Sequence, residues 1–135
     1  MILVDTSVWI DWLQRGNRPA TIVLDRLIDE DDIALAPVIL QELLQGARGP
    51  AQLAELRDRF AGMPMLEQTL QTYSAAGELY ARCRWVGITP RSPHDCLIAI
   101  TAIENGVPIL HDDRDFGNLA RVETRLQLLP RQRSR

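Results

Sequence analysis

Residues 2–5 read Ile-Leu-Val-Asp and residues 109–113 read Ile-Leu-His-Asp-Asp, so a short apolar run leads into aspartate twice. Short, continuous apolar runs are typical of strands that are buried on both faces of a parallel sheet. A third run, at residues 33–36, is followed by Pro37, which suits the first turn of a helix. These runs therefore predict three strands of one buried sheet.

Segments between these runs space their apolar residues as amphipathic helices do. The helices that we expect cover residues 8–14, 20–29, 37–46, 52–61, 69–85, 92–105 and 113–120, with further strands at 63–66 and 124–129. Strands that alternate with helices predict a three-layer α/β/α sandwich with a mainly parallel central sheet. We expect residues 1–130 to form a single domain, followed by a short arginine-rich tail at residues 131–135.

The composition is that of an ordinary globular protein. The chain has 135 residues, 46% of them hydrophobic and 24% charged, which fits one domain with a substantial core. No apolar run approaches the length of a membrane span, and the first residues lack the basic region of a signal peptide. We therefore expect a cytoplasmic protein without a membrane partner. Cys83 and Cys96 fall in helical segments and are expected to be buried free thiols.

All 15 basic residues are arginine, and the absence of lysine excludes several functions. A P-loop requires a lysine, and so does any mechanism with a lysine nucleophile or a lysine that clamps phosphate. The net charge of −3 argues mildly against a nucleic-acid binder. That argument weakens if bound cations neutralise several carboxylates, because the charge count leaves out the metal.

Acidic residues that are far apart in the sequence follow predicted strands or lie near the start of predicted helices: Asp5, Glu42, Asp95, Asp113 and Asp115. Asp5, Asp113 and Asp115 come just after strands, whereas Glu42 lies about one turn into a helix and Asp95 lies in the first turn of another. Ligands of an open parallel sheet bind beyond the carboxyl ends of its strands. We therefore expect these acids to gather at one edge of the sheet.

Each acid, taken alone, has an ordinary structural explanation. Asp5, Asp95 and Asp113 could cap helices, and Glu42 could be a solvated helix residue. Their convergence is harder to explain, because two carboxylates about 5 Å apart repel by about 3 kcal/mol at an effective dielectric constant near 20. Since the ligands are hard oxygens, the cation that offsets this repulsion would be Mg²⁺ or Mn²⁺. Such ions activate water and stabilise charge on a phosphoryl group, so a phosphodiester is the expected substrate.

Four segments of the chain carry a recognisable pattern. They are Ile-Leu-Val-Asp-Thr-Ser-Val at 2–8, Val-Ile-Leu-Gln-Glu-Leu at 38–43, Ser-Pro-His-Asp at 92–95 and His-Asp-Asp-Arg-Asp-Phe at 111–116. The pattern resembles that of PIN domains, and in particular that of the VapC ribonuclease toxins of bacterial toxin–antitoxin pairs. It covers nearly the whole chain, about residues 1–129, and its Asp-Arg-Asp-Phe frame selects Asp113 rather than Asp112.

This resemblance implies an endoribonuclease that depends on Mg²⁺ or Mn²⁺ and acts as the toxin of a toxin–antitoxin pair. It implies a PIN-like nuclease domain over residues 1–130 with four catalytic and metal-binding acids: Asp5, Glu42, Asp95 and Asp113. Asp5 and Asp95 would form the tighter metal site, and the other two acids would position water or a second ion. The accessory residues that it implies are Asp115, Thr6 and Ser7.

The resemblance also implies three partners: an RNA substrate, a cognate VapB-like antitoxin and a second copy of the chain in a homodimer. Arg91, Arg114 and the arginines of the tail could contact RNA phosphates. Trp9 and Trp12 lie one helical turn apart, and we expect them in the core or at a surface that meets the dimer partner or the antitoxin.

Two other classes of function stay open. An aspartate-nucleophile phosphatase would use Asp5, but such enzymes need a second acid two residues on and a phosphate-clamping lysine, whereas this chain has Ser7 and no lysine. A non-catalytic PIN-like binding module would instead use the acids to dock a basic partner peptide. A covalent phosphate on Asp5 would support the phosphatase, and a metal without effect on stability or RNA cleavage would support the binding module.

Overall fold

The computed structural model describes residues 1–130, so the predicted tail with Arg131, Arg133 and Arg135 lies outside the described residues. Within residues 1–130, four short strands form one sheet: β1 (Ile2–Val4), β2 (Ile33–Ala34), β3 (Ile109–Leu110) and β4 (Leu128–Leu129). Their order is β2-β1-β3-β4, and every pairing is parallel. The predicted parallel sheet is therefore confirmed.

The register of the sheet brings two chain segments to the same edge. Val4 at the end of β1 pairs with Leu110 at the end of β3. The backbone N–H of Asp5 then donates to the carbonyl of Leu110 at 3.0 Å. Because both strands run in the same direction and end side by side, the residues that follow them meet at one edge.

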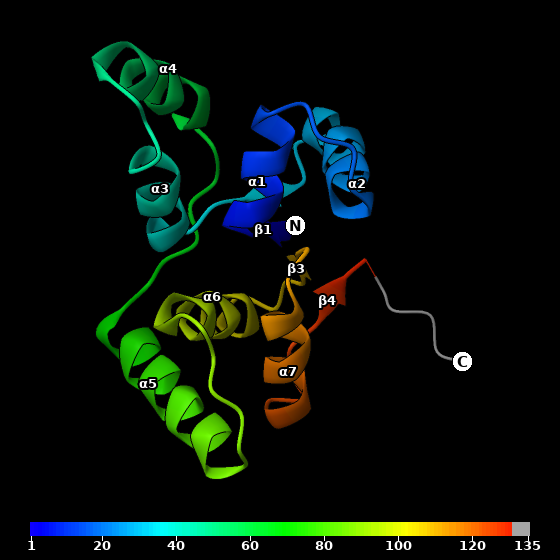
Figure 1. The fold of residues 1–135 in the computed structure, drawn as a ribbon, viewed down its shortest axis with the longest axis vertical. Coiled ribbons are helices and arrows are strands. Elements are labelled where there is room, and N and C mark those ends of the chain that lie inside the picture. Colours follow the sequence, from blue (N-terminus) through cyan, green and yellow to red (C-terminus); the bar gives the residue numbers. More distant parts are fainter. Residues whose placement is uncertain (131–135) are drawn as a thin grey trace.

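Helices follow each of the first three strands and cover the sheet. Within the described residues they are α1 (Thr6–Leu13), α2 (Pro19–Leu27), the 3₁₀ helix η1 (Ile28–Glu30), α3 (Pro37–Leu44), α4 (Pro50–Phe60), α5 (Leu70–Trp85), α6 (Pro93–Glu104) and α7 (Arg114–Val122). In Figure 1, α1 to α4 lie in the upper half of the molecule and α5 to α7 in the lower half, with β1 and β3 near the boundary between them and β4 beside α7. This arrangement agrees with the predicted layered α/β fold.

Helix α1 begins two residues earlier than the sequence predicts. Asp5, and not Ser7, is the last extended residue before the helix. The carbonyl of Asp5 accepts from the backbone N–H groups of Val8 and Trp9 at 3.1 and 3.3 Å, so Asp5 already takes part in the first turn. The strand therefore passes into the helix without a loop, and this places Asp5 at the edge of the sheet.

The segment at 63–66 does not form the predicted edge strand. It contributes a single parallel bridge between Leu35 and Met65. The carbonyl of Pro64 accepts from the backbone N–H of Leu35 at 2.9 Å, but Pro64 has no N–H of its own to extend the ladder. The strands predicted at 33–36 and 124–129 are also shorter than expected, with two residues each.

The core confirms several side-chain predictions. Trp9 is fully buried and packs edge-to-face against Phe60 with 5.1 Å between ring centroids. Cys83 and Cys96 are buried free thiols, as predicted. Gly106, with a φ of 64°, follows α6 in a left-handed conformation that favours glycine. Among the described residues, every helix is too short or too polar to cross a bilayer.

Candidate metal site at the edge of the sheet

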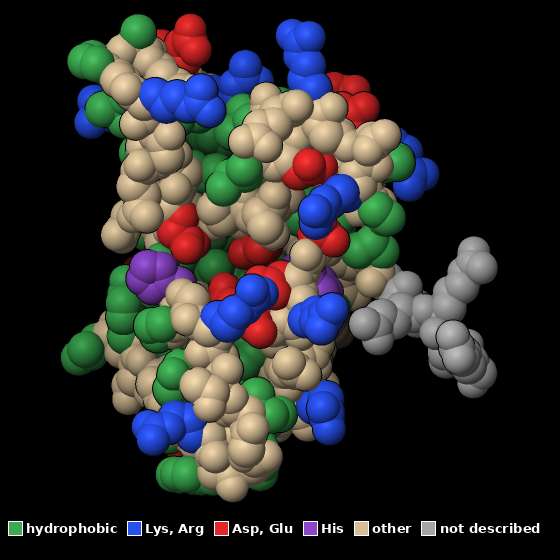
Figure 2. All heavy atoms as spheres, viewed as in Figure 1, with side chains coloured by type: hydrophobic (Ala, Val, Ile, Leu, Met, Phe, Trp, Pro, Cys, Tyr) green, Lys and Arg blue, Asp and Glu red, His purple; other side chains and the backbone are tan. Residues whose placement is uncertain are grey.

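The most compact part of the site is a trio of carboxylates. Asp95, Asp113 and Asp115 each offer one oxygen, and these oxygens lie within 4.8 Å of one another. Asp95 is in the first turn of α6, Asp113 immediately precedes α7, and Asp115 is in the first turn of α7. The amino-terminal ends of two helices, whose dipoles favour negative charge, therefore meet at this trio. Figure 2 shows acidic side chains gathered near the middle of this face, partly covered by basic ones.

Asp5 approaches the site from the end of β1. The residue is only 5% exposed, and the hydroxyl of Ser7 donates to its Oδ2 at 2.8 Å. Burial raises the pKa of Asp5 to about 6, although the Ser7 hydroxyl and the backbone amides of Thr6 and Ser7 lower it. The negative charge of Glu42 adds a smaller upward shift to this pKa. The ionised form of Asp5 is therefore stabilised only in part.

Glu42 projects from α3 and is held from two sides. The hydroxyl of Thr6 donates to its Oε1 at 2.8 Å, and the Nδ1 of His94 lies 3.5 Å from its Oε2. Thr6 thus supports Glu42, while Ser7 supports Asp5, so both predicted accessory hydroxyls contact an acid of the site. The sequence offered no sign that His94 would contact Glu42, although His94 directly precedes Asp95.

Asp95 is the electrostatic centre of the site. Its pKa is raised to about 7, first by burial and then by the negative charges of four other acids: Asp5, Asp113, Asp115 and Glu42. At the start of α6 the hydroxyl of Ser92 accepts from the backbone N–H of His94 at 3.1 Å and so caps the helix. Asp5, Glu42 and Asp113 therefore all lie near enough to raise the pKa of Asp95. Asp115, which was predicted as an accessory residue, also raises this pKa and belongs to the compact trio.

Asp113 has a structural contact as well as a place in the trio. Its Oδ1 accepts the backbone N–H of Asp115 at 3.0 Å and so caps α7, which confirms the structural explanation anticipated from the sequence. The Nδ1 of His111 lies 2.9 Å from the backbone oxygen and 3.2 Å from the backbone nitrogen of Asp113. Asp112 is not part of the trio, and its Oδ2 pairs with NH1 of Arg18 at 2.6 Å. The geometry thus distinguishes the two adjacent aspartates, as the Asp-Arg-Asp-Phe frame predicts.

Arg91 contacts two members of the trio directly. Its NH2 lies 2.7 Å from Oδ1 of Asp113, and its Nε lies 2.9 Å from Oδ2 of Asp115. The sequence predicts only that this arginine could contact phosphate, and it gives no sign of these ion pairs. The one available signal was position, since Arg91 directly precedes the Ser-Pro pair that starts α6.

The donor chemistry of the site fits a hard divalent cation. The trio offers carboxylate oxygens only, which are the ligands that Mg²⁺ and Mn²⁺ prefer. The hollow beside it has a volume of about 660 Å³ and is bordered by Ser7, Arg91, Asp113 and Asp115, among others. Asp113 and Asp115 can therefore be reached from solution.

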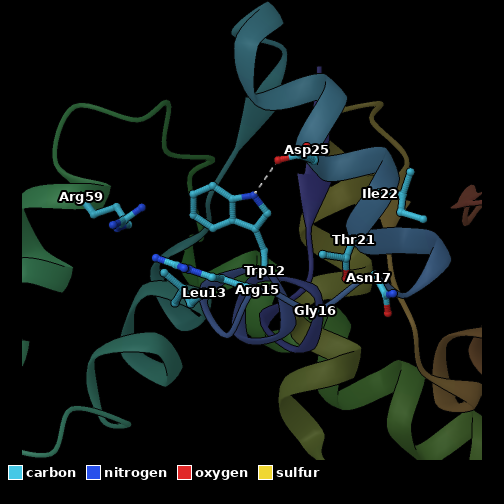
Figure 3. A pocket seen from close by; sticks show the side chains of 9 residues that line it. All are labelled: Trp12, Leu13, Arg15, Gly16, Asn17, Thr21, Ile22, Asp25 and Arg59. Atoms are coloured by element: carbon cyan, nitrogen blue, oxygen red, sulfur yellow. Dashed lines mark hydrogen bonds between the residues drawn. The ribbon is translucent and has the colours of Figure 1, made fainter.

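A second hollow, of about 640 Å³, is bordered by residues of α1, α2 and α4 (Figure 3). There the indole N–H of Trp12 donates to Asp25 Oδ1 at 3.4 Å, and the guanidinium carbon of Arg59 lies 5.4 Å from the Trp12 ring centroid. Asp25 is the single acid among its lining residues. We therefore place the candidate active site at the acidic edge of the sheet.

The fold and site together define a mixed α/β protein whose parallel sheet carries a cluster of acids suited to a divalent cation. The family model for the PIN domain matches residues 2–122. The VapC ribonuclease Mb1587 of Mycobacterium bovis and the ribonuclease VapC11 of Mycobacterium tuberculosis are each 37% identical over 131 residues, covering 94% of this chain and 96% of each relative. The chain therefore belongs to the PIN domain family, within its VapC branch.

Solved structures with the same fold include VapBC2 from Rickettsia felis, bound to a DNA fragment from the promoter. That chain has a TM-score of 0.72 and 20% identity, with 95% of this chain and 97% of that chain covered. FitAcB from Neisseria gonorrhoeae has a TM-score of 0.67 and 20% identity, with 95% and 96% covered. At this level of identity the likeness supports the fold, and the site must be argued from its own residues.

Proposed function

We propose that this protein is a divalent-metal-dependent endoribonuclease that hydrolyses RNA phosphodiester bonds. The observation that carries the proposal is the trio of Asp95, Asp113 and Asp115, whose carboxylate oxygens lie within 4.8 Å of one another. Burial and the charges of neighbouring acids raise the pKa of Asp95 in the same site. A cluster of this kind lowers the stability of a protein unless a cation binds it. The similarity to ribonucleases of the VapC branch supports RNA as the substrate.

In this proposal the trio of Asp95, Asp113 and Asp115 holds Mg²⁺ or Mn²⁺, and Asp5 and Glu42 contribute from the neighbouring elements. A bound ion of this kind supplies an activated water and stabilises the charge that develops on a phosphoryl group. The hydroxyl of Ser7 fixes Oδ2 of Asp5, and the hydroxyl of Thr6 fixes Oε1 of Glu42. These contacts preset the two carboxylates, so that less ordering is needed when the substrate arrives.

We further propose that the protein is the toxin of a toxin–antitoxin pair, with a VapB-like antitoxin as its partner. Two similar structures were solved as VapBC2 and FitAB bound to DNA fragments, which supports a protein partner for this chain. A homodimer and a single nuclease domain over residues 1–130 belong to the same proposal. Co-expression with the product of a neighbouring short reading frame, followed by size-exclusion chromatography, would test the pairing.

The activity is tested with purified protein and single-stranded RNA, with Mg²⁺ or with a chelator. We expect cleavage only with the ion, and a loss of at least about 100-fold in Asp95→Asn. Asp112→Asn removes the same charge from a residue that pairs with Arg18, and we expect it to keep most of the activity. Cleavage in chelator, or full activity of Asp95→Asn, would contradict the proposal. RNA binding without cleavage would favour the binding module, and a covalent phosphate on Asp5 would favour the phosphatase.

A further inference from the structure

Arg91 reaches across the mouth of the acidic trio. Its guanidinium contacts Asp113 through NH2 at 2.7 Å and Asp115 through Nε at 2.9 Å. The backbone N–H of Arg91 also points to Oδ2 of Asp115, at 3.4 Å. One arginine thus contacts two acids of the trio with two different nitrogens, a forked arrangement that suits the planar guanidinium group.

The oxygens that Arg91 contacts belong to the residues that would hold the metal ion. Asp113 Oδ1 already accepts the N–H of Asp115 as well as the Arg91 guanidinium. An oxygen with two donors has little capacity left for a cation. A divalent ion close to the guanidinium would also be repelled by its positive charge. Arg91 and a metal ion therefore compete for the same part of the trio.

The position of Arg91 allows it to leave. Its side chain is 73% exposed, whereas those of Asp113 and Asp115 are 22% and 12% exposed. Arg91 lies just before α6, outside the helix that holds Asp95. A mainly exposed side chain can change rotamer without disturbing the packed core, so its displacement requires no change in the fold.

We propose that Arg91 is a built-in counter-cation that occupies the acidic trio until a divalent metal ion binds and displaces it. The inference rests on the proposed metal-dependent function and specifies what neutralises the acids of that site before the ion binds. Arg91 neutralises part of the charge on Asp113 and Asp115 in the metal-free protein. Metal binding is then an exchange of one cation for another, and its affinity is lower than the acids alone would give.

The test is calorimetric titration of Mn²⁺ into metal-free protein for the wild type, Arg91→Gln and Arg114→Gln. Arg114 borders the same hollow and has the same charge, so its variant reports the general effect of losing one nearby arginine. We expect Arg91→Gln to bind Mn²⁺ at least about 10-fold more tightly than the wild type, and Arg114→Gln to change the affinity by less than about 3-fold. Arg91→Lys keeps the positive charge but lacks the two guanidinium nitrogens that contact Asp113 and Asp115. Its affinity for Mn²⁺ should therefore lie between those of the wild type and Arg91→Gln.

Other results would overturn the inference. Weaker Mn²⁺ binding by Arg91→Gln would mean that the arginine orients the metal ligands and does not compete with the ion. Equal effects of Arg91→Gln and Arg114→Gln would mean that only general electrostatics is involved. Either result leaves the proposed metal-dependent function intact. If neither the wild type nor any variant binds Mn²⁺ while all remain folded by circular dichroism, the proposed metal site fails and the inference fails with it.

Discussion

Two buried carboxylates of this protein, Asp5 and Glu123, differ in what surrounds them. They are 5% and 6% exposed. Glu123 accepts from Arg82 at 2.9 Å and from Arg125 at 2.9 and 3.2 Å, and its pKa is lowered to about 2, chiefly by the hydrogen bond from Arg125. The pKa of Asp5 is instead raised to about 6, chiefly by burial. The two pKa values therefore shift in opposite directions, because hydrogen bonds from arginine outweigh desolvation at Glu123, whereas desolvation dominates at Asp5.

This contrast distinguishes a structural acid from an acid of a binding site. At Glu123 the chain itself supplies the cations, so the carboxylate is stable when ionised and needs nothing from solution. At Asp5 and Asp95 the neighbouring groups are mainly other acids and hydroxyls, and ionisation is unfavourable. Asp113 and Asp115 are an intermediate case, because they do have a cationic partner, Arg91, but its side chain is exposed and can be replaced by an ion. In the proposed function, an external cation would stabilise the acids at the edge of the sheet, whereas the chain's own arginines stabilise Glu123.

The largest expected effect that would sharpen this comparison is stabilisation by metal. With Mg²⁺ at about 100 times its dissociation constant, the wild type should gain about 3 kcal/mol, and its melting temperature should rise by roughly 10 °C. Scanning calorimetry with Mg²⁺ and with chelator measures this shift. Glu123→Gln should keep the full shift, and Asp95→Asn should lose most of it. A shift that survives in Asp95→Asn would place the ion elsewhere.

The next effect is the dependence of stability on pH. Because Asp5 binds its proton more tightly when folded, its contribution is fully present below about pH 4 and is lost as pH rises through about 6. In the metal-free protein the contribution of Asp5 to the free energy of unfolding is about 2 to 3 kcal/mol. Asp95 also stabilises the fold when protonated, and its contribution is lost as pH rises through about 7.

Urea unfolding at a series of pH values measures this change, and Asp5→Asn should flatten the slope. Glu123 acts in the opposite direction, since its contribution is present above about pH 4.5 and is lost as pH falls towards about 2. Metal-free stability that rises steadily between pH 4.5 and 7 would contradict the account.

A smaller effect is expected from the structural acid itself. Glu123→Gln removes the charge that Arg82 and Arg125 contact, and it should lower the free energy of unfolding by about 1 kcal/mol, since both arginines are partly exposed. Urea unfolding gives the stability, and the RNA cleavage assay gives the activity. We expect the activity to be unchanged once the protein is folded. A large loss of activity in folded Glu123→Gln would remove the distinction between the two kinds of acid.

Much of the fold could be predicted from local patterns. The apolar runs at the three core strands, and Pro37 after one of them, predict a parallel sheet and the start of α3. The rule that parallel strands end at the same edge was enough to predict that Asp5 and Asp113 converge. These features depend on residue type and order, which the sequence gives directly.

Other features depend on register and on helix rotation, which the sequence does not give. Arg91 and Asp115 are 24 residues apart, and their contact depends on how the starts of α6 and α7 meet. The contact between His94 and Glu42 likewise depends on the packing of α6 against α3. For the same reason, Asp115 was predicted as an accessory acid although its oxygen belongs to the compact trio.

The stability of metal-free Asp95→Asn tests most directly whether these acids are held together against their own repulsion. The measurement is the free energy of unfolding in urea at pH 8 with chelator, compared with that of the wild type. The account predicts that the variant is more stable by about 1 kcal/mol, allowing for the partial exposure of Asp95 to solvent. A variant less stable than the wild type by more than about 1 kcal/mol would show that Asp95 supports its helix as a structural residue.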